Sequence, residues 1–173
     1  MRRVRPPGVA ARSAPLAQTI TAYLIAAGVV TIDQLTKRWA AAEFADAPLV
    51  LIPGWLSLRF TENPGAAFSL FQNAGPFLGL AAVVAVGLVG AALARSRPGY
   101  EVAAFGLIIG GALGNLIDRL TRGPGVLDGR VIDWVQLPNF PTFNVADSAI
   151  TMAVVTLLIG SWRSSPGRTT ADG

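Results

Sequence analysis

Apolar residues fill four long stretches of this chain, and polar or Pro- and Gly-rich segments separate them. The stretches cover 17–32, 76–94, 102–117 and 144–162. A helix needs about 20 apolar residues to cross the hydrocarbon core of a bilayer, and the first stretch continues in helical style as far as Lys37. The pattern therefore predicts an all-α membrane domain with four transmembrane helices.

The segment that follows the first stretch changes to a period of two. Leu56, Leu58 and Phe60 alternate with polar residues, and a Pro-Gly pair before them has the composition of a turn. This alternation predicts a small extracytoplasmic β-hairpin whose apolar face is turned toward the membrane surface or a substrate. Residues 131–143 are broken by two prolines. We expect them to form an extended segment at the membrane interface.

Arginines indicate how the helices are oriented, because cytoplasmic loops of membrane proteins carry an excess of basic residues. Three clusters occur, at the N-terminus, between the second and third stretches, and at the C-terminus. Their members are Arg2, Arg3, Arg5, Arg12, Arg95, Arg97, Arg163 and Arg168. Four spans put all three clusters on one side, which predicts that both termini are cytoplasmic and that 37–75 and 118–143 lie outside.

The same reasoning predicts three parts of the chain. A disordered basic tail covers 1–15, a single membrane domain covers 16–163, and a polar tail covers 164–173. The N-terminal region also has some features of a cleaved signal peptide. That alternative is disfavoured because Asp33 and Lys37 stand where a cleavage region should be small and neutral.

Composition excludes several classes of function. The chain is 52% hydrophobic and 14% charged, which leaves too little polar surface for a soluble domain of this size. Basic residues form no stripe interleaved with aromatics, so nucleic acid is not an expected partner. Cysteine and histidine are both absent, which removes thiol nucleophiles, Ser-His-Asp triads and His-based zinc sites. Any catalysis must use Asp, Glu, Lys, Arg, Ser, Thr, Asn or Tyr.

Charged side chains near the ends of membrane helices are costly, and each is therefore a candidate for function. Here such residues gather at one predicted depth, on the outer side, together with three asparagines. The set is Asp33, Lys37, Asp118, Arg119, Asp133, Asp147, Asn63, Asn115 and Asn144.

Most members of this set also fit purely structural roles. Asp33 and Lys37 are four residues apart in the favourable order for a helix ion pair. Asp118 fits the end of a helix, Asn144 fits the N-cap of the fourth span, and Asn63 fits a turn leaving the hairpin. These structural interpretations stay open beside the functional ones.

Asp133 and Asp147 are harder to explain structurally. Asp133 lies within the apolar run 131–135, and Asp147 is followed at once by the fourth span. Two carboxylates brought together in such a place cannot both ionise cheaply, so one is expected to hold a proton near neutrality. The pair then supplies a general base and a general acid, which suffice to activate water against a peptide carbonyl. A structural carboxylate pair is the alternative.

Five segments resemble lipoprotein signal peptidase, the type II signal peptidase family of bacterial inner membranes. They are DQLTK at 33–37, TENPGAAF at 61–68, GGALGNLIDR at 110–119, VIDW at 131–134 and FNVADSAI at 143–150. The segments occur in the family's order and extend over residues 33 to 150. One of them alone would be a weak signal, whereas the five together are highly specific.

The resemblance implies an aspartic endopeptidase that removes the signal peptide from diacylglyceryl-modified prolipoproteins, just before the lipid-bearing Cys. It implies that Asp133 and Asp147 are catalytic. Further matching positions are implied to line or support the site: Asn63, Asn115, Arg119, Asn144, Asp33, Lys37, Gly111, Asp118 and Ala146. Gly111 is implied to permit close helix packing. The implied partners are prolipoproteins and membrane lipid, with no metal or other cofactor, and a monomer is sufficient.

Other peptidase classes fit this sequence less well. A Ser/Lys-type signal peptidase would use Lys37 as base with Ser57, Ser69 or Ser148 as nucleophile, but the chain has no room for the large soluble β domain of that class. A presenilin-type peptidase would carry Gly-x-Gly-Asp, which does not occur.

Two further rivals come from other classes. A small transporter or channel would spread its carboxylates through the depth of the membrane, whereas here they gather at one predicted face. A metal-dependent hydrolase would use Asp118, Asp133 and Asp147 as oxygen ligands. Resistance of the activity to chelators distinguishes that enzyme from an aspartate pair.

Overall fold

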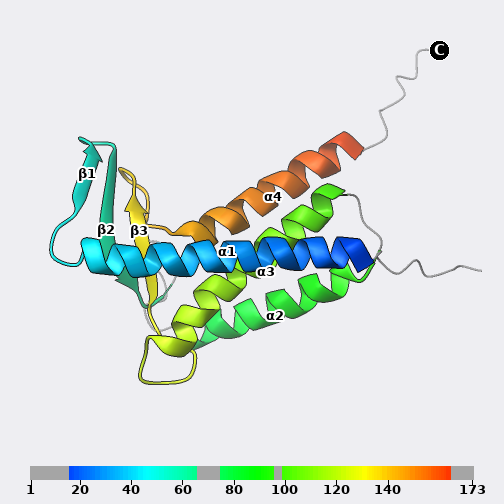
Figure 1. Ribbon diagram of the computed structural model, residues 1–173, viewed down its shortest axis with the longest axis horizontal. Helices are drawn as coiled ribbons and strands as arrows, with labels where there is room; N and C mark the ends of the chain where they lie inside the picture. The colour runs from blue at the N-terminus through cyan, green and yellow to red at the C-terminus, as the bar shows by residue number, and fades with distance from the viewer. Residues whose placement is uncertain (1–15, 66–74, 96–98, 165–173) are drawn as a thin grey trace, which may run out of the picture.

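The computed structural model describes residues 16–65, 75–95 and 99–164. Its helices are α1 (Leu16–Glu43), α2 (Gly75–Leu93), α3 (Gly99–Thr121) and α4 (Val145–Ser164). All four are long and apolar enough to cross a membrane. The strands β1 (Leu49–Ile52), β2 (Leu56–Asn63) and β3 (Val131–Gln136) form one antiparallel sheet in the order β1-β2-β3. The sheet lies at the Glu43 end of α1 (Figure 1). The predicted fold class is confirmed.

Two helices are longer than the apolar pattern predicted. Helix α1 continues past Lys37 to Glu43, and α3 continues past Asp118 to Thr121. The charged residues Asp33 and Lys37 on α1 and Asp118 and Arg119 on α3 are buried, and buried charges are tolerated where they are paired. The interpretation of Asp118 as the end of a helix is therefore wrong, because α3 continues to Thr121. The expectations for residues 1–15 and 165–173 fall outside the described part of the chain.

The hairpin of β1 and β2 forms as predicted, with Gly54 at φ 73° in its turn. One expectation about it was wrong. Leu58 is buried in a cluster with Ala40 and Phe44, and Phe60 packs against that cluster. The apolar face of β2 is thus core, because α1 extends far enough to cover it, and it does not face the membrane surface or a substrate.

The pairing of β2 with β3 was not predicted, and it positions the site. Residues 131–136 are extended, as expected, but they are the third strand of the sheet. Thr61 pairs with Asp133 and Asn63 pairs with Val131. This register brings the end of the hairpin beside the apolar run that carries Asp133.

Helix α3 contacts each of the other three helices, and its glycines allow close approach. A Cβ at Gly110 would lie 2.8 Å from the Ala26 carbonyl oxygen on α1. A Cβ at Gly111 would lie 2.5 Å from the Ala146 carbonyl oxygen on α4. Residues without a side chain are needed here because the backbones themselves meet. Gly111 therefore lies where the backbones of α3 and α4 approach closely.

Substituting Gly111→Ala should lower stability by about 1–3 kcal/mol, the usual penalty for overpacking. The added methyl would strike the Ala146 carbonyl and the Ile150 side chain, displacing the first turn of α4. Gly87→Ala on α2 is the matched control, because nothing lies within 4 Å of its Cβ position. Thermal unfolding in detergent measures both. Equal melting temperatures for the two variants would contradict the packing argument.

Candidate active site

Asp133 lies on β3 with 3% of its surface exposed. Two amides donate to its carboxylate: Asn63 Nδ2 to Oδ2 at 3.0 Å, and Asn144 Nδ2 to Oδ1 at 2.7 Å. Burial raises the pKa of the Asp133 carboxyl to about 7, and the negative charge of Asp147 acts in the same direction. The amide donors oppose this rise because they stabilise the ionised form. Asp133 therefore titrates near neutrality.

Asp147 lies in the first turn of α4. Its backbone N–H donates to Asn144 Oδ1 at 2.9 Å, and its own Oδ2 accepts from the Asn144 backbone N–H at 3.3 Å. This reciprocal pair is a capping arrangement that satisfies two N–H groups at the helix start. Asn115 Nδ2 on α3 donates to Asp147 Oδ1 at 2.8 Å. The carboxylate is thus held from two elements.

Asn144 joins the two aspartates. Its side chain is fully buried. The Oδ1 atom caps α4, while Nδ2 reaches Asp133 Oδ1, the Ile132 carbonyl at 3.2 Å and Asn115 Oδ1 at 3.2 Å. The N-cap and the site interpretations of Asn144 are therefore compatible, since one amide serves both.

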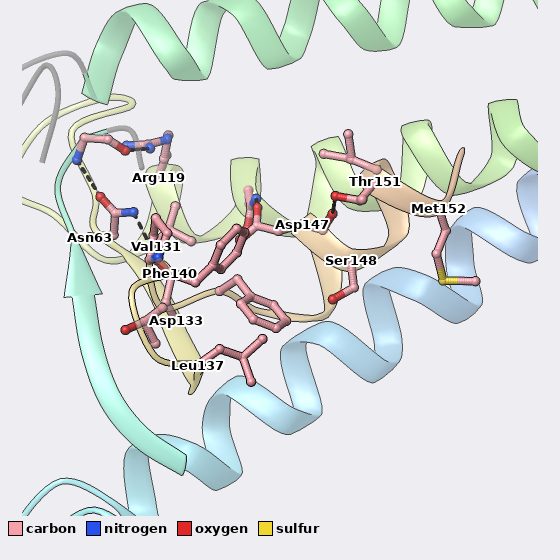
Figure 2. A pocket seen from close by; sticks show the side chains of 16 residues that line it. Asn63, Arg119, Val131, Asp133, Leu137, Phe140, Asp147, Ser148, Thr151 and Met152 are labelled. Atoms are coloured by element: carbon pink, nitrogen blue, oxygen red, sulfur yellow. Dashed lines mark hydrogen bonds between the residues drawn. The ribbon is translucent and has the colours of Figure 1, made fainter. Parts of the chain in front are cut away.

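A cavity of about 680 Å³ contains both aspartates in its lining. Figure 2 shows Asn63 and Arg119 at one end of it and Thr151 and Met152 at the other, with the aspartates between. Much of the remaining lining is apolar: Val131, Leu137, Phe140, Pro141, Phe143 and Ile150. A cavity with much apolar lining and a few polar groups, two of them carboxylates, suits a largely apolar ligand.

A buried ionic cluster lies behind the cavity. Lys37 Nζ lies 2.7 Å from Asp33 Oδ2 and 2.8 Å from Asp118 Oδ2, and all three side chains have no exposed surface. Lys37 Nζ also donates to Asn115 Oδ1 at 2.9 Å. The predicted Asp33–Lys37 ion pair is present. Asp118 belongs to the same cluster and also accepts from Arg122 Nε at 3.0 Å.

The remaining candidate positions hold backbone segments together. Arg119 donates to the Gly65 carbonyl at 3.0 Å and to the Gly129 carbonyl at 3.4 Å. The Ala146 backbone N–H donates to Asp33 Oδ1 at 2.9 Å. Asp33 therefore joins α1 to the first turn of α4, immediately before Asp147.

A family model described as signal peptidase (SPase) II matches residues 25–163. The chain belongs to the signal peptidase II family. Two similar relatives are called lipoprotein signal peptidase. The protein from Rhodococcus jostii (strain RHA1) is 42% identical over 79% of this chain and 70% of its own length. The protein from Parasynechococcus marenigrum (strain WH8102) is 41% identical over 81% of this chain and 87% of its own length.

Solved structures resemble this chain as well. One, described as a bacterial membrane enzyme, has a TM-score of 0.73 and 26% identity, covering 94% of this chain and 98% of that one. A second structure with the same description has a TM-score of 0.70 and 28% identity, and the match covers 90% of this chain and 99% of the other. The fold is therefore shared over nearly the full length of both chains.

Sequence reasoning missed several residues of this site. Gln34 Nε2 donates to Asp118 Oδ1 at 3.1 Å and to the Gly114 carbonyl at 3.0 Å. Its place between Asp33 and Lys37 in the first matching segment was an available signal. The apolar lining at Leu137, Phe140 and Phe143 was also missed, and a proline-broken segment gives no signal of that kind.

Proposed function

We propose that this chain cleaves prolipoprotein signal peptides with water activated by Asp133 and Asp147, just before the lipid-bearing Cys. One observation carries the proposal. Both carboxylates line one cavity and share Asn144 as a partner, yet their surroundings differ. Asp133 is buried on a strand, whereas Asp147 lies at the start of a helix, where backbone N–H groups favour a negative charge.

This asymmetry assigns a role to each residue. Asp147 is the ionised base and takes a proton from the attacking water. Asp133 starts protonated and donates to the oxygen of the scissile carbonyl as the water oxygen attacks its carbon. Asp147 then donates its proton to the leaving nitrogen while the ionised Asp133 takes a proton from the tetrahedral diol. The C–N bond breaks, a carboxylic acid and an amine form, and both aspartates return to their starting states.

Asn63 and Arg119 have supporting roles in this proposal. Both line the cavity beside Asp133. An amide and a guanidinium there are suited to hold the substrate backbone and the developing oxyanion. The apolar lining beyond them suits the signal peptide and its lipid.

The proposed site faces the outer side of the bacterial inner membrane. The sheet lies at one end of the helix bundle (Figure 1), Asp133 is on its strand β3, and Asp147 is in the first turn of α4. At the other end of the bundle, Arg95 follows the end of α2 and Arg163 stands in the last turn of α4. Basic residues favour the cytoplasmic side. A membrane-held precursor would present its scissile bond at the opposite surface.

The rival mechanisms lose support from the same geometry. Lys37 bonds to Asp33, Asp118 and Asn115, while the Ser148 hydroxyl donates to the Asn144 carbonyl. A Ser/Lys pair is not assembled from these two residues. Asp118 is likewise occupied by its cationic partners, which makes it a poor third ligand for a metal.

Purified protein should cleave a lipid-modified precursor in the presence of a chelator, with activity that falls as pH rises through about 7. The raised pKa of Asp133 means that the required proton is present below that pH and lost above it. Replacing Asn63 by Ala removes a donor that lowers this pKa, so the alkaline limb of kcat/KM should move to higher pH.

Glu62→Gln is the matched control for that shift. Glu62 is the exposed neighbour of Asn63 on β2 and pairs with Arg130 at 3.5 Å, away from Asp133. Its substitution should leave the alkaline limb in place. A profile that stays flat between about pH 5 and 9 would count against a shared proton.

A further inference from the structure

The ammonium of Lys37 has three hydrogens and no acceptor. Its three neighbours are Asp33 Oδ2, Asp118 Oδ2 and Asn115 Oδ1, at 2.7, 2.8 and 2.9 Å. The side chain is fully buried. Each hydrogen therefore has one acceptor, and the direction of each bond is fixed.

This arrangement determines the orientation of the Asn115 amide. Because an ammonium only donates, the Asn115 atom that faces Lys37 must be the oxygen. The NH2 group is then turned toward Asp147 Oδ1, 2.8 Å away. Asn144 Nδ2 donates to the same Asn115 oxygen at 3.2 Å. A reversed amide would place its NH2 against two donors and its oxygen against a carboxylate.

We infer that Lys37 is a positioning residue for Asp147: it holds the Asn115 amide with its N–H group directed at that carboxylate. The inference rests on the proposed role of Asp147 as the base. Lys37 is not among the residues that line the cavity, and it makes no described contact with Asp147; it reaches the cavity only through Asn115, which lines it. Asn115 transmits the effect.

Energetics favour a positioning role over a purely stabilising one. Removing charges from water costs several kcal/mol per ion, and apolar residues of similar volume often stabilise a protein equally well. A buried Lys–Asp–Asp cluster is thus a poor device for stability alone. It does impose a single donor direction on a neighbouring amide, which an apolar cluster does not.

The test is a double-mutant cycle on the full chain in detergent, with a lipid-modified precursor as substrate. Lys37→Met should lower kcat by about 10- to 100-fold, the effect of losing one hydrogen bond to a charged group, and leave KM within about twofold. Asn115→Ala should lower kcat at least as much. Combined with Asn115→Ala, Lys37→Met should cost less than about twofold more, because residues in one chain of contacts are not additive.

Controls separate positioning from folding. Arg122→Gln removes another cation from Asp118, but Arg122 makes no described contact with Asn115, so kcat should be nearly unchanged. Lys37→Met leaves two buried carboxylates unbalanced. The pair Lys37→Met/Asp118→Asn keeps the net charge of the cluster, and its kcat should still fall about 10-fold relative to Asp118→Asn alone.

Two results would overturn the inference. One is an equal loss of kcat from Lys37→Met with and without Asn115. The other is a kcat that Arg122→Gln lowers as much as Lys37→Met does, or a Lys37→Met variant whose melting temperature falls while its kcat does not. Asp147→Asn distinguishes these failures from failure of the proposed function, because turnover by that variant would remove the aspartic mechanism itself.

Discussion

Replacing either Asp133 or Asp147 by Asn should lower kcat for a lipid-modified precursor by about 10⁴-fold or more, as for other residues that act as one catalytic unit. In the proposed mechanism each aspartate has a separate task in each step, so the remaining carboxylate cannot substitute for the missing one. The double variant should be no worse than either single one. The measurement is turnover by purified protein in the presence of a chelator.

Folding and membrane insertion should persist in these variants, because Asn has the shape of Asp and keeps one oxygen as an acceptor. Asp46→Asn and Asp128→Asn are the matched controls. Both residues are exposed and lie in loops, so these variants should keep near-normal activity. Substantial turnover by Asp133→Asn or Asp147→Asn would refute the mechanism.

Asn144→Ser should lower kcat by about 10²- to 10³-fold while the protein stays folded, in the range of losing a preorganised donor at an active site. Serine is a good N-cap, so its hydroxyl can accept the Asp147 N–H in place of Asn144 Oδ1. It cannot replace the Nδ2 group that donates to Asp133 and Asn115. Turnover and thermal unfolding, measured together, separate the two functions of the amide.

Asn144→Ala provides the comparison, because it loses the cap as well as the donor. Its kcat should match that of Asn144→Ser, and its stability should be lower by about 1 kcal/mol, the usual contribution of an N-cap. If Asn144→Ser keeps wild-type kcat, the residue is only a helix cap and the shared partner of the two aspartates has no role in catalysis.

The sequence was sufficient to predict the four helices, the hairpin and the gathering of polar residues at one end. These depend on local patterns: long apolar stretches, an alternation of period two, and charges at similar depths. The Asp33–Lys37 pair was predictable for the same reason, since both residues lie on one helix and their spacing is enough.

What could not be predicted depends on contacts between distant segments. An alternating pattern identifies a strand but not the strand it pairs with, so the pairing of Thr61 with Asp133 could not be predicted. Lys37 on α1 also donates to Asn115, which lies on α3, and this contact between two helices could not be read from the sequence. Leu58 was assigned to the wrong environment because periodicity shows that one face is apolar without showing what covers it.

The two aspartates come from parts of the chain that are completed at different times. Asp133 belongs to a strand that pairs with the earlier hairpin, while Asp147 and Ala146 open the last described helix. A nascent chain still lacking α4 has neither the second carboxylate nor the backbone N–H that binds Asp33. Under the proposed mechanism, the pair of carboxylates is therefore complete only once α4 has been added to the growing chain.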